Sequence, residues 1–225
     1  MIARSELPDV PWRRAVAIAA GAGIAVSLLL GLLVRIQVIV DEVDGEWMEE
    51  VLEMRGPFWE AVSRGFDFLG GGWFAIWAVP LAVAIVLLLL RRPWSALLFI
   101  AVSAVSAGVV QLLKALYDRA RPEDILLELD NGSYPSGHVA NAATIAVLAT
   151  VLVARWWVAV AGAVYVVLMA LSRTYLGAHW ITDTIGGALL GASVALLGWA
   201  VLAPRLRKER ESPRPREGSA ASVGT

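Results

Sequence analysis

Long stretches of apolar residues, separated by short segments rich in charged residues, make up most of the chain. A helix rises about 1.5 Å per residue, so about 20 apolar residues are enough to cross the roughly 30 Å hydrocarbon core of a bilayer. Six stretches come close to that length, and the pattern predicts an all-α integral membrane protein with a bundle of six transmembrane helices. The stretches are residues 15–34, 73–90, 94–113, 139–154, 156–171 and 184–203.

The fourth and fifth stretches are separated only by Arg155. One helix over residues 139–171 would be about 50 Å long, which is too long for a single span. We therefore expect a tight hairpin at Arg155, although neither Gly nor Pro marks a turn there. The first stretch continues into Arg35 without the small-residue cleavage site of a signal peptide, so we interpret it as a retained helix.

The composition supports a membrane protein. Hydrophobic residues make up 58% of the 225 residues and charged residues 17%, against about 25% charged residues in a soluble domain. The formal net charge of -1 leaves no strongly basic surface, so we expect no nucleic-acid partner. The absence of cysteine excludes disulfides, thiolate metal sites and a cysteine nucleophile.

Arginine and lysine residues predict the orientation in the membrane. Four basic segments fall on one side of a six-span arrangement, and an excess of basic residues in short loops marks the cytoplasmic side. We therefore expect a multi-pass protein of the plasma membrane with both termini in the cytoplasm. The basic residues on that side are Arg4, Arg13, Arg14, Arg91, Arg92, Arg155, Arg205, Arg207, Lys208, Arg210, Arg214 and Arg216.

Three further segments surround or interrupt the predicted six-span domain, residues 15–203. Residues 1–14 form a cytoplasmic N-terminus, and residues 204–225, rich in Pro, Ser and charged residues, predict a disordered cytoplasmic tail. The acidic segment 35–72 forms an extracytoplasmic loop, and its last three residues, 70–72, are glycines that predict a flexible joint before the second span.

The extracytoplasmic loop contains an amphipathic pattern. Trp47, Val51, Met54 and Phe58 recur at spacings of four, three and four residues among acidic residues, which predicts a short helix lying on the membrane. Two interpretations of this helix stay open. It packs onto the outer ends of the spans, or the segment 46–62 gates the access of lipid.

Three clusters of polar residues stand at the predicted outer ends of spans three to six. The basic residues among them lie on the side where the positive-inside rule disfavours them, which suggests a function. Both histidines of the chain also belong to these clusters. We therefore place the candidate active site at the extracytoplasmic ends of helices 3 to 6. In chain order the clusters contain Lys114, Arg121 and Pro122; Tyr134, Pro135, Ser136, Gly137 and His138; and Ser172, Arg173, His179 and Asp183. Arg119 is a further basic residue on the disfavoured side.

The basic residues of these clusters indicate an anion-binding site. Lys114, Arg121 and Arg173 supply three positive charges, and a phosphate suits them best because guanidinium groups bind its oxygens in a bidentate manner. Ser136 and Gly137 stand at the predicted start of a helix, where free N–H groups and the helix dipole favour the same anion. Taken alone, Lys114 and Arg121 would be interpreted as snorkelling anchors, and the Pro-Ser-Gly-His sequence as a turn with an N-cap.

The histidines are candidates for a nucleophile and a general acid. His179 and Asp183 are four residues apart, so they share one face of a helix, and the carboxylate can fix the imidazole tautomer that attacks phosphorus. His138, from a different helix, is the natural general acid. The pair of His179 and Asp183 is also compatible with a satisfied polar pair or with half of a metal site. His138 is the only other imidazole, however, and nearby cations would repel a divalent ion, so we expect no metal and no cofactor.

The three clusters resemble the signature of the type 2 phosphatidic acid phosphatase superfamily, which consists of integral membrane lipid phosphatases. Its parts read K-x6-R-P, P-S-G-H and S-R-x5-H-x3-D, and residues 114–183 match them without a departure. The resemblance implies that His179 forms a phosphohistidine, that Asp183 orients it, and that His138 protonates the leaving group, without a metal. It further implies that the phosphoryl oxygens are bound by Lys114, Arg121, Ser136, Gly137 and Arg173.

The predicted function is hydrolysis of a phosphate monoester or diphosphate of a lipid. Phosphatidic acid, phosphatidylglycerol phosphate and undecaprenyl diphosphate stay open as substrates, and the sequence predicts no oligomeric state. A transporter is one alternative, but its ionisable residues would lie near the bilayer midplane rather than at span ends. A catalytically silent scaffold on the same fold is another, although such proteins usually lack a catalytic residue and none is missing here. The similar vanadium haloperoxidases are soluble and larger.

Overall fold

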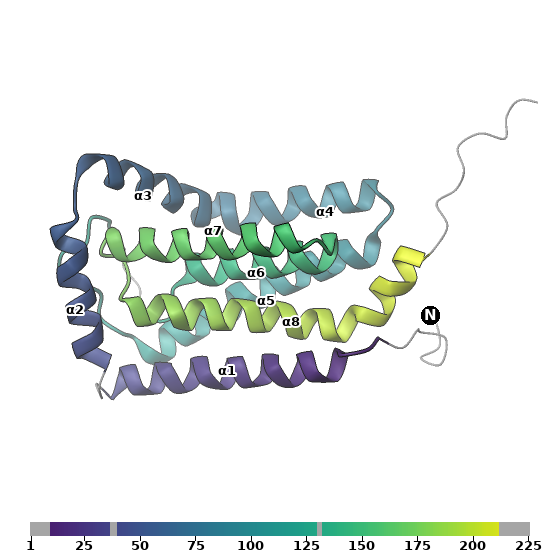
Figure 1. Cartoon of the computed structure of the whole chain (residues 1–225), viewed down its shortest axis with the longest axis horizontal. Helices are drawn as coiled ribbons and strands as arrows, with labels where there is room; N and C mark the ends of the chain where they lie inside the picture. Colours follow the sequence, from purple (N-terminus) through teal and green to yellow (C-terminus); the bar gives the residue numbers. More distant parts are fainter. Residues whose placement is uncertain (1–9, 37–39, 130–131, 212–225) are drawn as a thin grey trace, which may run out of the picture.

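The computed structural model describes residues 10–36, 40–129 and 132–211, and helices joined by loops make up these ranges (Figure 1). No strand occurs in these ranges, in agreement with the predicted all-α class. In chain order the helices are α1 (Arg13–Arg35), α2 (Val40–Glu53), α3 (Pro57–Gly70), the π-helical turn η2 (Phe74–Ala78), α4 (Val79–Leu89), α5 (Pro93–Tyr117), α6 (Gly137–Val153), α7 (Trp156–Tyr175) and α8 (Ile181–Glu211).

The long helices α1, α5, α6, α7 and α8 run along the long axis of the molecule, and α2 crosses one end of the bundle (Figure 1). Helix α8 packs against α6, α1 and α5, while α3 packs against α7. Apolar side chains of α5, α6 and α8, among them the fully buried Leu98, Leu148 and Leu190, form the main core. The bundle is therefore organised around α8.

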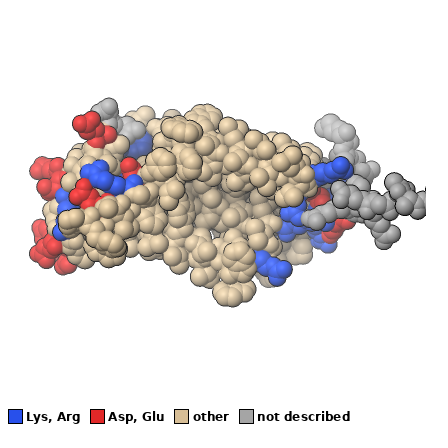
Figure 2. Space-filling view, turned by 90° about the horizontal axis from the view of Figure 1, so that it is seen from above, with Lys and Arg blue, Asp and Glu red and all other residues tan. Residues whose placement is uncertain are grey.

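Four helices, α1, α5, α7 and α8, are each long and apolar enough to cross a membrane. A fifth span results if α3 and the helix Phe74–Leu89, which meet at a bend of 44°, are counted together. Helix α6 is apolar but has 17 residues. Figure 2 shows charged side chains gathered at the two ends of the molecule, with a broad uncharged band between them. The protein is therefore a multi-pass membrane protein, and helix length alone accounts for four or five of the six predicted spans.

The stretch predicted as the second span, residues 73–90, is shorter as a helix than the other long ones. It starts with the π-helical turn Phe74–Ala78 and continues as α4 to Leu89. Gly72 precedes it with a left-handed φ of 60°, a conformation that glycine adopts without strain. The predicted glycine joint thus coincides with the bend between α3 and this apolar helix.

The prediction of one continuous amphipathic helix from Trp47 to Phe58 is wrong. Helix α2 ends at Glu53, and a new helix, α3, begins at Pro57 after the extended residue Gly56. The reason is the proline, which cannot donate the backbone hydrogen bond that a continuing helix needs but suits the first turn of a new one.

The two halves of the predicted amphipathic stripe have different surroundings. Met48 and Val51 of α2 are buried against Tyr175 at the end of α7. Met54 and Phe58 are instead exposed, by 59% and 68%. The structure therefore favours the packing interpretation for α2.

Helix α8 continues seven residues beyond Pro204, so the disordered tail predicted from residue 204 is wrong for its first part. Glu209 accepts a hydrogen bond of 2.6 Å from the backbone N–H of Trp94, at the start of α5. Arg210 donates one of 3.1 Å to the carbonyl oxygen of Leu152, at the end of α6. These contacts satisfy free backbone groups at neighbouring helix ends, which explains the additional helical turns.

Two predicted segments fall largely outside the described residues. They are the N-terminus, described only from residue 10, and the last part of the tail, residues 212–225. Three of the basic residues used to predict the orientation, Arg4, Arg214 and Arg216, belong to these parts.

The predicted hairpin at Arg155 is present between α6 and α7. Ala154 adopts a left-handed conformation with φ of 55°, and Arg155 is extended. The N–H of Ala154 donates a 2.8 Å hydrogen bond to the carbonyl oxygen of Thr150, which closes the end of α6. Alanine thus takes the position that glycine usually occupies at a helix end, and this is why no Gly marks the turn.

Close contact between α6 and α8 depends on two glycines. A Cβ atom at Gly191 would lie 2.1 Å from the carbonyl oxygen of Ala140, and one at Gly187 would lie 2.5 Å from that of Ser136. The two glycines are four residues apart, a spacing of small residues with which membrane helices approach closely. They therefore determine how near α8 lies to the first turns of α6.

We predict that Gly191→Ala forces α6 and α8 apart. The expected loss is about 1–3 kcal/mol, as for overpacking in a core, and it should lower the melting temperature of the detergent-solubilised protein by roughly 2–10 °C. Gly108→Ala on α5 is the matched control, because a Cβ atom there meets nothing within 4 Å. Equal melting temperatures of the two variants would contradict the close approach.

Candidate active site

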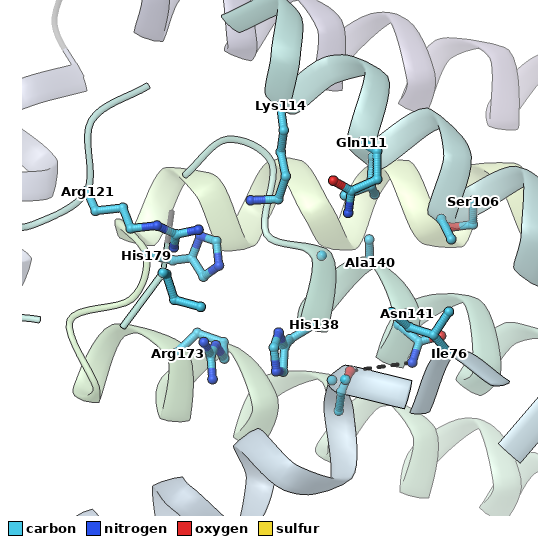
Figure 3. A pocket seen from close by; sticks show the side chains of 17 residues that line it. Ile76, Ser106, Gln111, Lys114, Arg121, His138, Ala140, Asn141, Arg173 and His179 are labelled. Carbon is cyan, nitrogen blue, oxygen red and sulfur yellow. Dashed lines mark hydrogen bonds between the residues drawn. The ribbon is translucent and has the colours of Figure 1, made fainter. Parts of the chain in front are cut away.

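A cavity of about 230 Å³ lies between the α3–η2 junction, α5, the start of α6, the end of α7 and the loop before α8. Figure 3 shows side chains from these elements pointing into one space. Of the predicted site residues, Ser136 and Asp183 do not line the cavity. Ser136 precedes the lining residue Gly137, and Oδ2 of Asp183 lies 3.5 Å from Nδ1 of the lining residue His179. The predicted site residues that line the cavity are Lys114, Arg121, Gly137, His138, Arg173 and His179.

Three cations surround the cavity. Lys114, in the last turn of α5, donates a hydrogen bond to the carbonyl oxygen of Gly132, and Arg121 donates one to that of Ala178. Arg173, in the last turn of α7, is fully buried. Its Nε and Nη2 atoms are buried without a hydrogen-bond partner among the described residues. Such donors beside a cavity are suited to bind the oxygens of an anion.

The start of α6 adds backbone donors to the same cavity. The helix begins at Gly137, with Ser136 as its N-cap, and the Ser136 side chain makes no capping hydrogen bond. The N–H groups of the first turn have no partner within the helix, and the helix dipole makes this end favourable for an anion. The Ser136 N–H donates a 3.0 Å hydrogen bond to the carbonyl oxygen of Asp183, which fixes the start of α6 on α8.

His179 lies in the short loop between α7 and α8, and its imidazole faces the cavity (Figure 3). Its Nδ1 atom is 3.5 Å from Oδ2 of Asp183, which is an ion-pair distance but too long for a good hydrogen bond. Burial lowers the pKa of His179 well below its ordinary value, and the charges of Lys114 and Arg173 lower it further. His179 is therefore neutral at neutral pH, the form in which an imidazole can act as a nucleophile.

Asp183 is held by groups other than His179. Its side chain is fully buried at the start of α8. Oδ1 accepts a 2.7 Å hydrogen bond from Arg119, and Oδ2 accepts one of 2.9 Å from the backbone N–H of Trp180. The carboxylate that stands behind His179 is thus fixed in place before any contact with a substrate.

His138, in the first turn of α6, approaches the cavity from another side (Figure 3). Its Nε2 atom lies 3.1 Å from Oδ1 of Asp67 and 3.2 Å from the Asp67 carbonyl oxygen. The two histidines that the sequence places far apart therefore share one cavity, together with the three cations.

Comparison with known proteins shows the family of the chain. The sequence profile of the PAP2 superfamily matches residues 94–207. Phosphatidylglycerophosphatase B of Bacillus subtilis (strain 168) is 32% identical over 182 residues, which cover 74% of this chain and 88% of that protein. The chain belongs to the PAP2 superfamily.

Two further similarities extend this result. Decaprenylphosphoryl-5-phosphoribose phosphatase of Mycobacterium tuberculosis (strain ATCC 25618 / H37Rv) is 34% identical over 145 residues, which cover 61% of this chain and 77% of that protein. The crystal structure of the transmembrane PAP2-type phosphatidylglycerolphosphate phosphatase from Bacillus subtilis superposes with a TM-score of 0.69 at 26% identity, covering 86% of this chain and 98% of that chain. The superfamily predicted from the signature is thus confirmed, and this PAP2 protein is a membrane phosphatase.

The sequence analysis missed the partner that fixes Asp183. Arg119 bridges two buried carboxylates, with Nη1 2.7 Å from Oδ1 of Asp183 and Nη2 2.7 Å from Oδ2 of Asp44. Asp44 belongs to α2 and also accepts a 3.0 Å hydrogen bond from the N–H of Thr182. Arg119 lies on the side where the positive-inside rule disfavours basic residues, and this position indicated that it has a role. Nothing in the sequence distinguished Asp44 from the other acidic residues of its loop.

Asp67 of α3 is a further residue that the sequence analysis missed. Its carboxylate contacts both His138 and Arg173, two of the predicted site residues. It lies outside the three signature clusters and outside the segment matched by the PAP2 profile. No spacing or charge pattern in the sequence connects it with them.

We predict that Arg119→Lys weakens catalysis, although the three cations that surround the cavity stay unchanged. A lysine cannot bridge Asp44 and Asp183 with a planar fork, and the loss of one hydrogen bond to a charged group costs about 1.5–3 kcal/mol. The expected decrease in kcat is about 10–100-fold, measured as phosphate release by the purified protein. Arg64→Lys, at an exposed pair with Glu60 on α3, should keep the activity. A fully active Arg119→Lys enzyme would contradict this role.

Proposed function

We propose that this PAP2 protein hydrolyses a phosphate monoester or diphosphate of a membrane lipid, without a metal, through a phosphohistidine at His179. The observation that carries the proposal is the meeting of three cations and two imidazoles around one cavity in an apolar bundle. The names of its relatives, which include phosphatases of lipid phosphates, support the substrate class. Phosphatidic acid, phosphatidylglycerol phosphate and undecaprenyl diphosphate are the proposed candidates.

The phosphoryl group would be held by the cations and by the start of α6. Lys114, Arg121 and Arg173, with the backbone at Gly137 and the N-cap Ser136, neutralise its oxygens, and a buried site makes these interactions strong. No aspartate or glutamate side chain lines the cavity in the described part of the chain. This lining suits an anion and repels a divalent cation, so the charges of the protein take the place of magnesium.

The reaction would proceed in two displacements. Neutral His179 attacks phosphorus through Nε2, the bond to the leaving oxygen breaks, and protonated His138 gives that oxygen a proton. Asp183 stabilises the positive charge that develops on the His179 ring. Water then gives a proton to His138 while its oxygen attacks phosphorus, the P–N bond breaks, and phosphate leaves.

The test of the function is phosphate release by the purified protein from a panel of the three candidate lipids. His179→Ala should reduce turnover to background, and His138→Ala should lower it by about 10²–10⁴-fold, as for the loss of a general acid. Short incubation with labelled substrate should leave an acid-labile phosphoenzyme in the wild type and none in His179→Ala. Activity should survive excess EDTA and be inhibited by vanadate. Near-normal turnover by His179→Ala, or activity restored only by magnesium, would contradict the proposal.

We further propose six spans with both termini in the cytoplasm and the cavity near the extracytoplasmic surface. In this arrangement residues 1–14 and 204–225 are cytoplasmic and residues 35–72 are an outer segment. The support is the location of Arg91, Arg92 and Arg155 in loops at one end of the bundle, away from α2 (Figure 1).

Cysteine labelling tests this orientation, because the chain has no native cysteine. In intact cells, a membrane-impermeant thiol reagent should modify Glu128→Cys, in the exposed segment before α6, but not Arg155→Cys, in the exposed α6–α7 turn. Permeabilising the membrane should make both accessible. The reverse pattern would invert the proposed topology.

A further inference from the structure

Asp67 stands between two residues of the proposed mechanism. Its Oδ1 atom lies 3.1 Å from Nε2 of His138, and the same atom accepts a hydrogen bond from Nη1 of Arg173. The Asp67 carbonyl oxygen adds a second acceptor, 3.2 Å from Nε2 of His138. One nitrogen of the His138 ring is thus fully engaged with α3, and Nδ1 is the nitrogen left to exchange a proton with a substrate.

We propose that Asp67 is a positioning residue for the general acid: it orients the His138 ring and stabilises the proton-carrying imidazolium. The inference rests on the proposed function, because it assigns a role within that reaction. It gives His138 a carboxylate partner, as Asp183 is the partner of His179. The active centre then contains two histidine–carboxylate pairs, one for the nucleophile and one for the acid.

Charge explains why His138 needs such a partner. Lys114 of α5, Arg121 of the following loop and Arg173 of α7 line the same cavity. Each of these cations disfavours a positive charge on the imidazole, whereas a general acid has to carry its proton before the leaving oxygen takes it. Asp67 is the carboxylate within ion-pair distance of His138 in the described part of the chain, and its charge acts against that repulsion.

The backbone after Asp67 is fitted closely to the same imidazole. A Cβ atom at Gly71 would lie 2.1 Å from Nε2 of His138, and one at Gly70 would lie 2.4 Å from the terminal methyl group of Met169. Only glycine permits this approach of the α3–η2 junction to the ring. Because α3 also packs against α7, the position of Asp67 is set by backbone contacts as well as by its ion pairs.

The proposed step keeps Asp67 ionised throughout. As the bond between phosphorus and the leaving oxygen breaks, the proton on Nδ1 of His138 moves to that oxygen, and the proton on Nε2 stays hydrogen-bonded to Asp67. Neutral His138 then accepts a proton at Nδ1 from the water that attacks the phosphohistidine, which restores the imidazolium. Asp67 exchanges no proton and contacts no substrate atom.

Asp67→Asn tests the proposal through its dependence on the leaving group. The variant keeps the size of the side chain but removes its charge. We expect kcat to fall at least about tenfold on dioctanoyl phosphatidic acid, whose alkoxide leaving group needs a proton, and less than about threefold on p-nitrophenyl phosphate, whose leaving group does not. Asp67→Glu should recover part of the loss. Glu60→Gln, at an exposed position on the same helix, is the matched control and should keep both activities.

A double variant separates a positioning role from a structural one. If Asp67 acts through His138, Asp67→Asn should cause no further loss in a His138→Ala background, because the group it assists is gone. Equal losses on both substrates, with additive effects in the double variant, would overturn the proposal. Undiminished turnover of Asp67→Asn together with tighter binding of vanadate would also overturn the proposal. That result would mean that Asp67 competes with phosphate for Arg173.

The same assays distinguish the failure of this inference from the failure of the proposed function. A wild-type protein that releases phosphate from neither substrate, or a His179→Ala variant as active as the wild type, contradicts the proposed function and with it the role of Asp67. An active, His179-dependent wild type whose Asp67→Asn variant shows no preference for the better leaving group contradicts the role of Asp67 alone.

Discussion

The structure depends on the neutralisation of positive charges that are buried in an apolar bundle. Arg173 is fully buried, and a buried guanidinium is costly unless a carboxylate or another acceptor faces it. Asp67 supplies that charge from α3, and Asp44 and Asp183 do the same for Arg119 from α2 and α8. Helices α2 and α3 are therefore held on the bundle by ion pairs as well as by apolar packing.

The burial that makes these cations costly also makes them effective. In a site of low dielectric, fixed donors interact more strongly with a phosphoryl group than they would in water, and they need no rearrangement when it arrives. The Nε and Nη2 atoms of Arg173, which have no hydrogen-bond partner among the described residues, have this character. The glycines of α8, which bring the start of α6 close to the start of α8, place His138 and His179 around the same donors.

The proposed reacting groups and two of the carboxylates beside them come from different parts of the chain. The segment matched by the PAP2 profile, residues 94–207, contains both histidines, the three cations and Asp183. Asp44 and Asp67 precede it, on α2 and α3. The segment between the first two apolar helices thus contributes charged side chains to the surroundings of the candidate active site.

Local properties of the chain were sufficient to predict the long apolar helices, the hairpin and the superfamily, because apolar periodicity, span length and the spacing of the polar clusters are read within short windows. Two features depended on neighbours that come together only in the folded bundle. Helix α8 continues past Pro204 because Glu209 and Arg210 meet the ends of α5 and α6. Asp67 faces His138, 71 residues away, because α3 packs against α7. The sequence by itself therefore indicated the candidate site residues, and only tertiary packing decided which carboxylates lie beside them, since an ion pair between distant residues leaves no periodic trace in the chain.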